Sequence, residues 1–384
     1  MTPKARPERG ALAEVAAVFL KLGLIGFGGP AAHVALMRRE VVDRRGWVTQ
    51  ERFLELFAAS NLIPGPTSTE LAIFLGQERA GWPALILAGA LFIVPAMAIV
   101  LTLAWIYVRF GSVPATGWVL YGVTPVAIGI VADALWQLGR TALRTIWLLL
   151  LALAVVGLYF LGVNVLVLLL GGGLVAFVAT ARRRPRSGGR GVAGLVPTFW
   201  SGPAAAAGGA SVSMTTLFLT FLKIGAVLYG GGYVLLAFLR ADFVSHLHWI
   251  TDRQLVDAVS IGQVTPGPLF TTATFVGYVV GGFRGALVAT AAIFLPSFGF
   301  VALVYRWLPR IQNSPSARVF LRGATASALG LMAAVTAQLG RAVIVDPFTA
   351  LLAVAAFVVL RRFQPNPVWL ILAGAVAGVL AKLI

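Results

Sequence analysis

Long apolar runs, separated by short charged stretches, dominate the sequence. Uncharged runs cover residues 82–108, 111–132, 145–181 and 285–305. About 20 apolar residues cross a bilayer as one helix, so each run predicts at least one membrane-spanning helix. The run at 145–181 is long enough for two helices with a turn near residues 162–164. The pattern predicts an all-α polytopic membrane protein.

Composition and charge support this class. Hydrophobic residues make up 59% of the 384 residues and charged residues 11%, whereas a soluble domain carries about 25% charged residues. Too little polar surface remains for a water-soluble globule or a disordered chain. The net charge of +17 comes mostly from basic residues in short loops, where they orient spans across a membrane. We therefore expect a multi-pass cell-membrane protein in contact with lipid, and no nucleic-acid partner.

Few residues suited to catalysis are present. The chain has no cysteine and only three histidines, which excludes disulfides and thiolate metal sites. No HExxH, GxSxG or Walker-type motif occurs. The sequence predicts no enzyme activity, no metal site and no cofactor.

The chain repeats itself at an offset of about 202 residues. Pro64-Gly65-Pro66 matches Pro266-Gly267-Pro268, Trp47 matches Trp249, and FLKLG at Phe19 matches FLKIG at Phe221. Chance matching of apolar residues would not align tryptophans and a PGP triplet in one register. We expect a first repeat at residues 11–181, a basic and Gly/Ala/Pro-rich linker at 182–212, and a second repeat at 213–384.

Each PGP triplet predicts a broken helix. Proline lacks an N–H group and disfavours helix at the preceding residue, and Pro66 suits the start of a new helix. The two arms, 53–63 and 67–77, have about 11 residues each, or ~16 Å of helix, which is half of a ~30 Å bilayer core. This favours a re-entrant hairpin with free N–H groups at its break, a suitable anion site. The alternative is a kink that only eases packing.

Glycine runs and intramembrane charges mark the first helix of each repeat. The runs break that helix, although close helix packing would also explain them. Lys21 and Lys223 lie about one turn before the breaks, where a charge indicates a functional pathway or snorkels to an interface. Four carboxylates in apolar segments are candidates for proton coupling, because desolvation favours their neutral form; the alternative is that they neutralise Lys or Arg. They are the symmetric pair Glu55 and Asp257, with Glu70 and Asp133 behind them.

These long motifs resemble the chromate ion transporter family, in its long-chain, two-domain form. The resemblance rests on residues 27–76, on FLKIGAVLYGGGYVLLAFLRADFV at 221–244, on VDAVSIGQVTPGPLFTTATFVGYVVGG at 256–282, and on residues 293–303 and 326–341. The stretch LGQERAGW at 75–82 departs from the family pattern. The resemblance implies a secondary transporter that exports chromate, and sulfate is a related tetrahedral dianion. A transporter or channel for sulfate or another anion is the alternative, and a homodimer is left open.

An oxyanion site is expected where the two PGP turns meet. Its expected residues are Lys21, Gly28, Gly29, Asn61, Gly65, Thr67, Ser68, Thr69, Lys223, Gly230, Gly231, Gln263, Thr265, Gly267, Thr271 and Thr272.

Topology follows from counting charges. If each repeat spans the membrane five times and also has a re-entrant hairpin, the number of spans per repeat is odd and the second repeat is inverted. Placing the loop after the first helix in the cytoplasm puts 19 basic residues inside and 9 outside, with two in the membrane. This agrees with the positive-inside rule, and the membrane potential and proton exchange are the expected driving forces.

Overall fold

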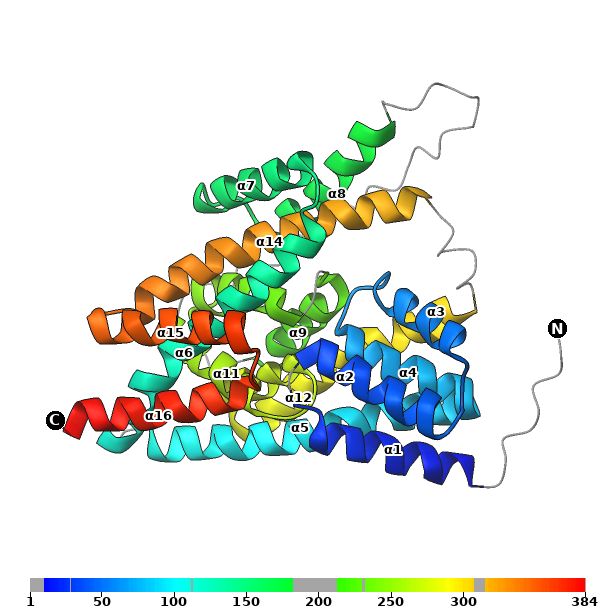
Figure 1. Ribbon diagram of the computed structural model, residues 1–384, viewed down its shortest axis with the longest axis horizontal. Coiled ribbons are helices and arrows are strands. Elements are labelled where there is room, and N and C mark those ends of the chain that lie inside the picture. The colour runs from blue at the N-terminus through cyan, green and yellow to red at the C-terminus, as the bar shows by residue number, and fades with distance from the viewer. Residues whose placement is uncertain are drawn as a thin grey trace.

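The computed structural model describes residues 10–27, 29–111, 113–181, 213–229, 232–306 and 315–383. The linker expected at 182–212 lies outside these residues, as do Gly28, Gly230 and Gly231 of the expected anion site. All regular elements in the described ranges are helices, as expected (Figure 1).

The two halves of the chain contain corresponding helices. The first half has α1 (Ala11–Ile25), α2 (Gly29–Arg38), η1 (Arg39–Arg44), α3 (Gln50–Ser60), α4 (Thr67–Ala80), α5 (Trp82–Phe110), α6 (Pro114–Ala142), α7 (Ile146–Phe160) and α8 (Val165–Ala181). The second half has α9 (Met214–Val227), η2 (Gly232–Val234), α10 (Leu235–Leu239), η3 (Arg240–His246), α11 (Asp252–Val264), η4 (Leu269–Thr271), α12 (Thr272–Tyr305), α14 (Pro315–Val343), α15 (Pro347–Phe363) and α16 (Pro367–Leu383).

The repeat seen in the sequence is also present in the backbone. Helix α12 corresponds to α4 and α5 together, and it has non-helical dihedral angles at Gly281 and Gly282. Gly282 has φ 61° and ψ −153°, close to the φ 75° and ψ −156° of Gly81 between α4 and α5. Both conformations favour glycine. The same bend therefore follows the PGP element in each half.

Within the described ranges, four helical segments are long and apolar enough to cross a membrane: Trp82–Phe110, Thr116–Ala142, Leu269–Tyr305 and Ser316–Val343. The apolar helices α7, α8, α9 and α16 have 14 to 17 residues. At 1.5 Å per residue they reach ~21–26 Å, less than a ~30 Å bilayer core. Each half thus has two full-length candidate spans and several shorter apolar helices. Five membrane spans per half stays a prediction.

The corresponding helices α5 and α12 pack against each other in opposite directions. The ring of Phe298 in α12 lies directly over Gly89 in α5. Two turns further along α12, the Tyr305 hydroxyl donates a 2.5 Å hydrogen bond to Glu78, near the end of α4. Since α4 leads through Gly81 into the start of α5, α12 runs toward that start, and the two helices are antiparallel.

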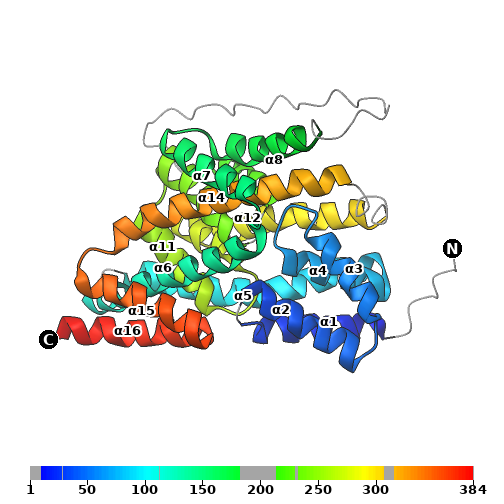
Figure 2. The ribbon, with the colours of Figure 1, turned by 45° about the horizontal axis from the view of Figure 1, so that its top comes forward.

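The last helices of each half pack on the other half. Helices α15 and α16 lie along α6, whereas α7 and α8 lie along α14 (Figure 1). Figure 2 shows this interleaving from a second direction. Backbones touch where small residues face each other, at Gly122 with Gly374 and at Gly172 with Gly323, as in many membrane helix pairs. Each half therefore completes the packing of the other.

The Gly122 contact predicts a position-specific loss of stability. A Cβ atom at Gly122 would stand 1.9 Å from the carbonyl oxygen of Gly374, whereas one at Gly117, in the same helix, would meet nothing within 4 Å. We expect Gly122→Ala to lower the free energy of unfolding by about 1–3 kcal/mol through overpacking. Gly117→Ala should leave it unchanged or raise it by up to ~1 kcal/mol. Thermal unfolding in detergent measures both, and equal effects would contradict the close α6–α16 contact.

Candidate functional site

Two backbone hydrogen bonds join the PGP turn of each half to the broken first helix of the other half. The Gly65 N–H donates to the Leu228 carbonyl at 2.9 Å, and the Gly267 N–H donates to the Gly26 carbonyl at 2.8 Å. Both donors and both acceptors are 202 residues apart, so the two contacts are equivalent. We call them the first crossing (Gly65–Leu228) and the second crossing (Gly267–Gly26).

The PGP sequence explains the break at each crossing. Helix α3 ends at Ser60 and α4 begins after Pro66, while α11 ends at Val264 and η4 begins after Pro268. Gly65 has φ +135° and Gly267 has φ +93°, values that L side chains rarely adopt. The flanking prolines and the central glycine together stop one helix, turn the chain and start another.

The start of α4 presents free donors, as expected of a helix N-terminus. The Thr69 and Glu70 N–H groups donate to the Pro66 carbonyl, whereas those of Thr67 and Ser68 have no acceptor within the described part of the chain. The Thr69 hydroxyl is buried and has no partner among the described residues. The first turn therefore has hydrogen-bond donors without acceptors among the described residues, and anion binding by them stays a prediction.

Most other expected polar ligands bond to nearby backbone. The hydroxyls of Thr265, Thr271 and Thr272 donate to the carbonyls of Gly262, Pro268 and Leu269. The Asn61 side-chain amide donates to the Phe57 carbonyl at 2.7 Å. These side chains hold the turns in shape, and an anion would compete with a backbone carbonyl for each donor.

A small cavity beside the second crossing brings residues from both halves together. Gly29 and Pro30 line it from the first half, and Tyr233, Gly262, Gln263, Thr265, Gly267, Leu269 and Pro367 line it from the second. Its volume is about 20 Å³, enough for a water molecule and too small for a five-atom oxyanion. The buried Gln263 Nε2 donor has no partner among the described residues.

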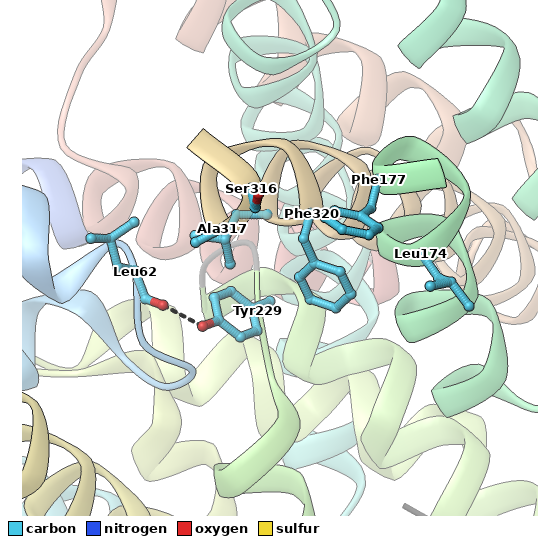
Figure 3. A pocket seen from close by; sticks show the side chains of 8 residues that line it. Leu62, Leu174, Phe177, Tyr229, Ser316, Ala317 and Phe320 are labelled. Atoms are coloured by element: carbon cyan, nitrogen blue, oxygen red, sulfur yellow. Dashed lines mark hydrogen bonds between the residues drawn. The ribbon is translucent and has the colours of Figure 1, made fainter. Parts of the chain in front are cut away.

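A wider pocket lies beside the first crossing (Figure 3). Its volume is about 430 Å³, and Leu62, Tyr229, Phe177 and Phe320 are among the side chains that line it. The Tyr229 hydroxyl donates to the Leu62 carbonyl, as the dashed line in Figure 3 marks. The residue equivalent to Tyr229 is Phe27, which has no hydroxyl. The two crossings thus share a backbone design and differ in side chains and in open volume.

The two lysines expected within the membrane form equivalent ion pairs. Lys21 lies 3.3 Å from Glu40, and Lys223 lies 2.6 Å from Asp242. Each carboxylate belongs to a π-helical segment, η1 or η3. Burial disfavours the charged form of Glu40, but hydrogen bonds from Lys21 and Arg45 outweigh it and hold the pKa of Glu40 below its usual value. The lysine charges are therefore shared with carboxylates, and a contact with an anion stays a prediction.

The four candidate carboxylates lie in unlike surroundings. Glu55 is half exposed and pairs with Arg52 at 2.8 Å, whereas Asp257 is buried and accepts a 2.8 Å hydrogen bond from Tyr107. The buried Asp133 accepts from Gln137 at 2.6 Å and has Arg361 at 3.7 Å. Glu70 is fully buried beside the Ser297 hydroxyl and has no counter-ion among the described residues. The sequence symmetry of Glu55 and Asp257 does not extend to their environments.

Two residues at the crossings were not singled out by the sequence. His33 is buried in α2, with Nε2 2.8 Å from the Gly26 carbonyl. Ser297, in α12, has its hydroxyl beside Gly65. The sequence signal that could have found them is a polar residue in an apolar stretch next to a helix-breaking motif. That motif is Gly26–Pro30 for His33 and Pro296 for Ser297.

Comparison with known proteins gives the family. The model of the family described as "Chromate transporter" matches residues 13–177 and again residues 215–379. The chain belongs to the chromate transporter family. Its members are transport proteins rather than enzymes, and the chain is a multi-pass membrane protein with two family repeats.

Three relatives that match over most of their length are also named for chromate transport. The chain is 34% identical over 372 residues to "Chromate transport protein" of Cupriavidus metallidurans, covering 95% of this chain and 91% of that one. It is 31% identical over 380 residues to "Probable chromate transport protein" of Synechococcus elongatus, covering 96% and 95%. It is 33% identical over 351 residues to "Chromate transport protein" of Pseudomonas aeruginosa, covering 88% and 84%. No solved structure matches the chain significantly.

In this member of the chromate transporter family, the ion pair of Lys223 with Asp242 predicts that the two side chains contribute to stability together. Lys223→Met and Asp242→Asn should each lower thermal stability in detergent, and the double variant should lose little more than either single variant. Since both side chains are partly exposed, the expected coupling is up to ~1 kcal/mol. Lys21→Met should cost less, because Glu40 keeps Arg44 and Arg45. Additive losses at Lys223 and Asp242 would show that the pair contributes no stability.

Proposed function

We propose that this protein is a secondary transporter that exports chromate from the cytoplasm. The observation that carries the proposal is the pair of crossings, in which two broken turns from different halves bond across to broken first helices. Non-helical backbone at membrane depth is tolerated where it is enclosed by protein or lines a cavity. Transporters use such breaks to bind ions with free backbone groups. The choice of chromate as the substrate rests on the relatives that are named for chromate transport.

The proposed anion site is centred on these turns. Free N–H groups of Thr67 and Ser68, the buried Thr69 hydroxyl and the Gln263 amide are donors, and a tetrahedral dianion has four acceptor oxygens. A helix N-terminus also carries a partial positive charge. Because the cavity at Gln263 is smaller than the ion, the second crossing has to open before the ion enters there.

The membrane potential is the proposed driving force. Moving two negative charges out of a negative interior releases roughly 4.6 kcal/mol per 100 mV, at ~2.3 kcal/mol per charge. Export therefore needs no nucleotide. Proton exchange through Glu55, Asp257, Glu70 or Asp133 stays a prediction. Sulfate is the alternative substrate, because N–H and amide donors recognise any tetrahedral dianion.

We further propose an inverted arrangement of the two halves in the membrane. The antiparallel packing of the corresponding helices α5 and α12 supports it, as does the charge count of 19 basic residues inside against 9 outside. Inverted repeats place a substrate site near the midplane, at the repeat interface.

Flux measurements test the substrate and the driving force. Purified protein in liposomes loaded with chromate should release it faster when the interior is made negative, and protein-free liposomes should not. Liposomes loaded with sulfate alone, measured separately, show whether sulfate replaces chromate. No chromate release, or release that ignores the potential, would refute the proposal.

A glutamine variant tests the anion site within that assay. Gln263→Ala removes a buried donor, and a hydrogen bond to a charged group is worth about 1.5–3 kcal/mol. We expect chromate affinity to fall by tenfold or more. Gln50→Ala, whose side chain accepts from Arg38 at 3.2 Å, is the matched control and should keep its affinity. Equal affinities would remove Gln263 from the site.

Cysteine labelling tests the inverted arrangement. The chain has no cysteine, so single cysteines can be introduced without background. Positions 51 and 253 are equivalent and exposed at the starts of α3 and α11. Glu51→Cys and Arg253→Cys should react with an impermeant thiol reagent from opposite sides of the membrane. Labelling of both from one side would mean parallel halves.

A further inference from the structure

Glu70 is a carboxyl group enclosed at the first crossing. It is fully buried in the first turn of α4, where the Ser297 hydroxyl is close enough to interact with its carboxyl group. A Cβ atom on Gly65 would stand 2.2 Å from Glu70 Oε1 and 2.7 Å from Ser297 Oγ. A carboxyl group of one half and a hydroxyl of the other thus flank the glycine that bonds to Leu228.

Most charged side chains on the helices packed against α4 are engaged elsewhere, and Glu51, Arg109 and Arg284 are exposed. His33 bonds to the Gly26 carbonyl, and Tyr229, at the break of the second half, is within electrostatic reach of Glu70. No charged group in the described part of the chain is a counter-ion for Glu70. The engaged groups are Glu14 with Arg45 and Arg79, Lys21 with Glu40, Arg38 with Asp43, Arg52 with Glu55 and Glu78, Tyr305 with Glu78, and Tyr107 with Asp257.

Among the described residues, the second crossing has no carboxyl group against its central glycine. Thr272 occupies the position equivalent to Glu70, and its hydroxyl donates to the Leu269 carbonyl. Ala96 occupies the position equivalent to Ser297, and a Cβ atom on Gly267 would stand 2.6 Å from the Ala96 methyl. Of the two equivalent turns, the first alone has a titratable side chain against its central glycine.

A charged Glu70 and a bound dianion would compete for one helix end. The free N–H groups of Thr67 and Ser68 lie within one 5.4 Å turn of Glu70. Like charges at that separation repel by several kcal/mol at the dielectric of a protein site. We propose that Glu70 is a proton site of this transporter and that a tetrahedral dianion binds at the first PGP turn only when Glu70 is protonated. This rests on the proposed anion transport.

The consequence is a proton taken up with the anion. A carboxylate oxygen of Glu70 forms an O–H bond with a proton from water, and no other bond changes. By linkage, the anion then raises proton affinity as much as the proton raises anion affinity. Loading the anion therefore takes up a proton, whereas the proton exchange expected from the sequence would release one.

Chromate binding at several pH values tests this in the purified full-length protein. Above the titration of Glu70, the wild type should lose about tenfold in affinity per pH unit, which is the effect of one linked proton. Glu70→Gln imitates the protonated carboxyl and should bind more tightly than the wild type at alkaline pH. Glu51→Gln makes the same change on an exposed side chain and should follow the wild type. Comparing variants at each pH removes the titration of chromate itself.

Proton uptake, at a pH above the titration of Glu70, is the second measurement. In weak buffer with a pH dye, chromate added to the wild type should raise the pH, and Glu70→Gln should give no such change. Equal pH profiles for the wild type and Glu70→Gln, or no proton uptake by the wild type, would overturn the proposal. Binding that depends on sodium at fixed pH and loses this dependence in Glu70→Gln would assign a metal cation instead. If the wild type binds no chromate at any pH, the proposed function fails.

Discussion

The need to satisfy broken backbone inside a membrane controls this structure. Each PGP triplet interrupts a helix, and an unsatisfied N–H or C=O group costs several kcal/mol where water is absent. The Gly65 and Gly267 N–H groups find acceptors at the breaks of the opposite first helices. Each half thus supplies what the other lacks, and the contact of Gly122 with Gly374 and its counterpart at Gly172 hold the halves together around these bonds.

Symmetric backbone with asymmetric side chains gives the two crossings different chemistry. The first has Glu70, Ser297 and Tyr229, whereas the equivalent positions at the second have Thr272, Ala96 and Phe27. His33, beside the second crossing, corresponds to Leu235. A duplicated framework therefore provides two similar turns, and few substitutions are enough to place a carboxyl group at one and a histidine at the other.

Local signals made the framework predictable from sequence, and tertiary contacts determined the rest. PGP triplets and glycine runs break helices by their own stereochemistry, so the repeat, the breaks and the helical class followed from the sequence. The partner of each break did not, because Gly65 and Leu228 are 163 residues apart. Equivalence in sequence also led to treating Glu55 and Asp257 as alike, but burial and partners depend on the helices packed around them.

Open volume distinguishes the crossings further. The pocket at the first crossing has about 430 Å³, and the cavity at the second has about 20 Å³. A dianion does not fit the smaller space, so in the proposed transport cycle the second crossing has to separate as the ion passes. Breaking the Gly267–Gly26 bond where water is absent would leave an N–H and a C=O group unpaired, at several kcal/mol each. The roughly 4.6 kcal/mol that 100 mV supplies to an exported dianion does not exceed that cost, so the opened turn has to pair these groups with water or, for the N–H group, with the ion.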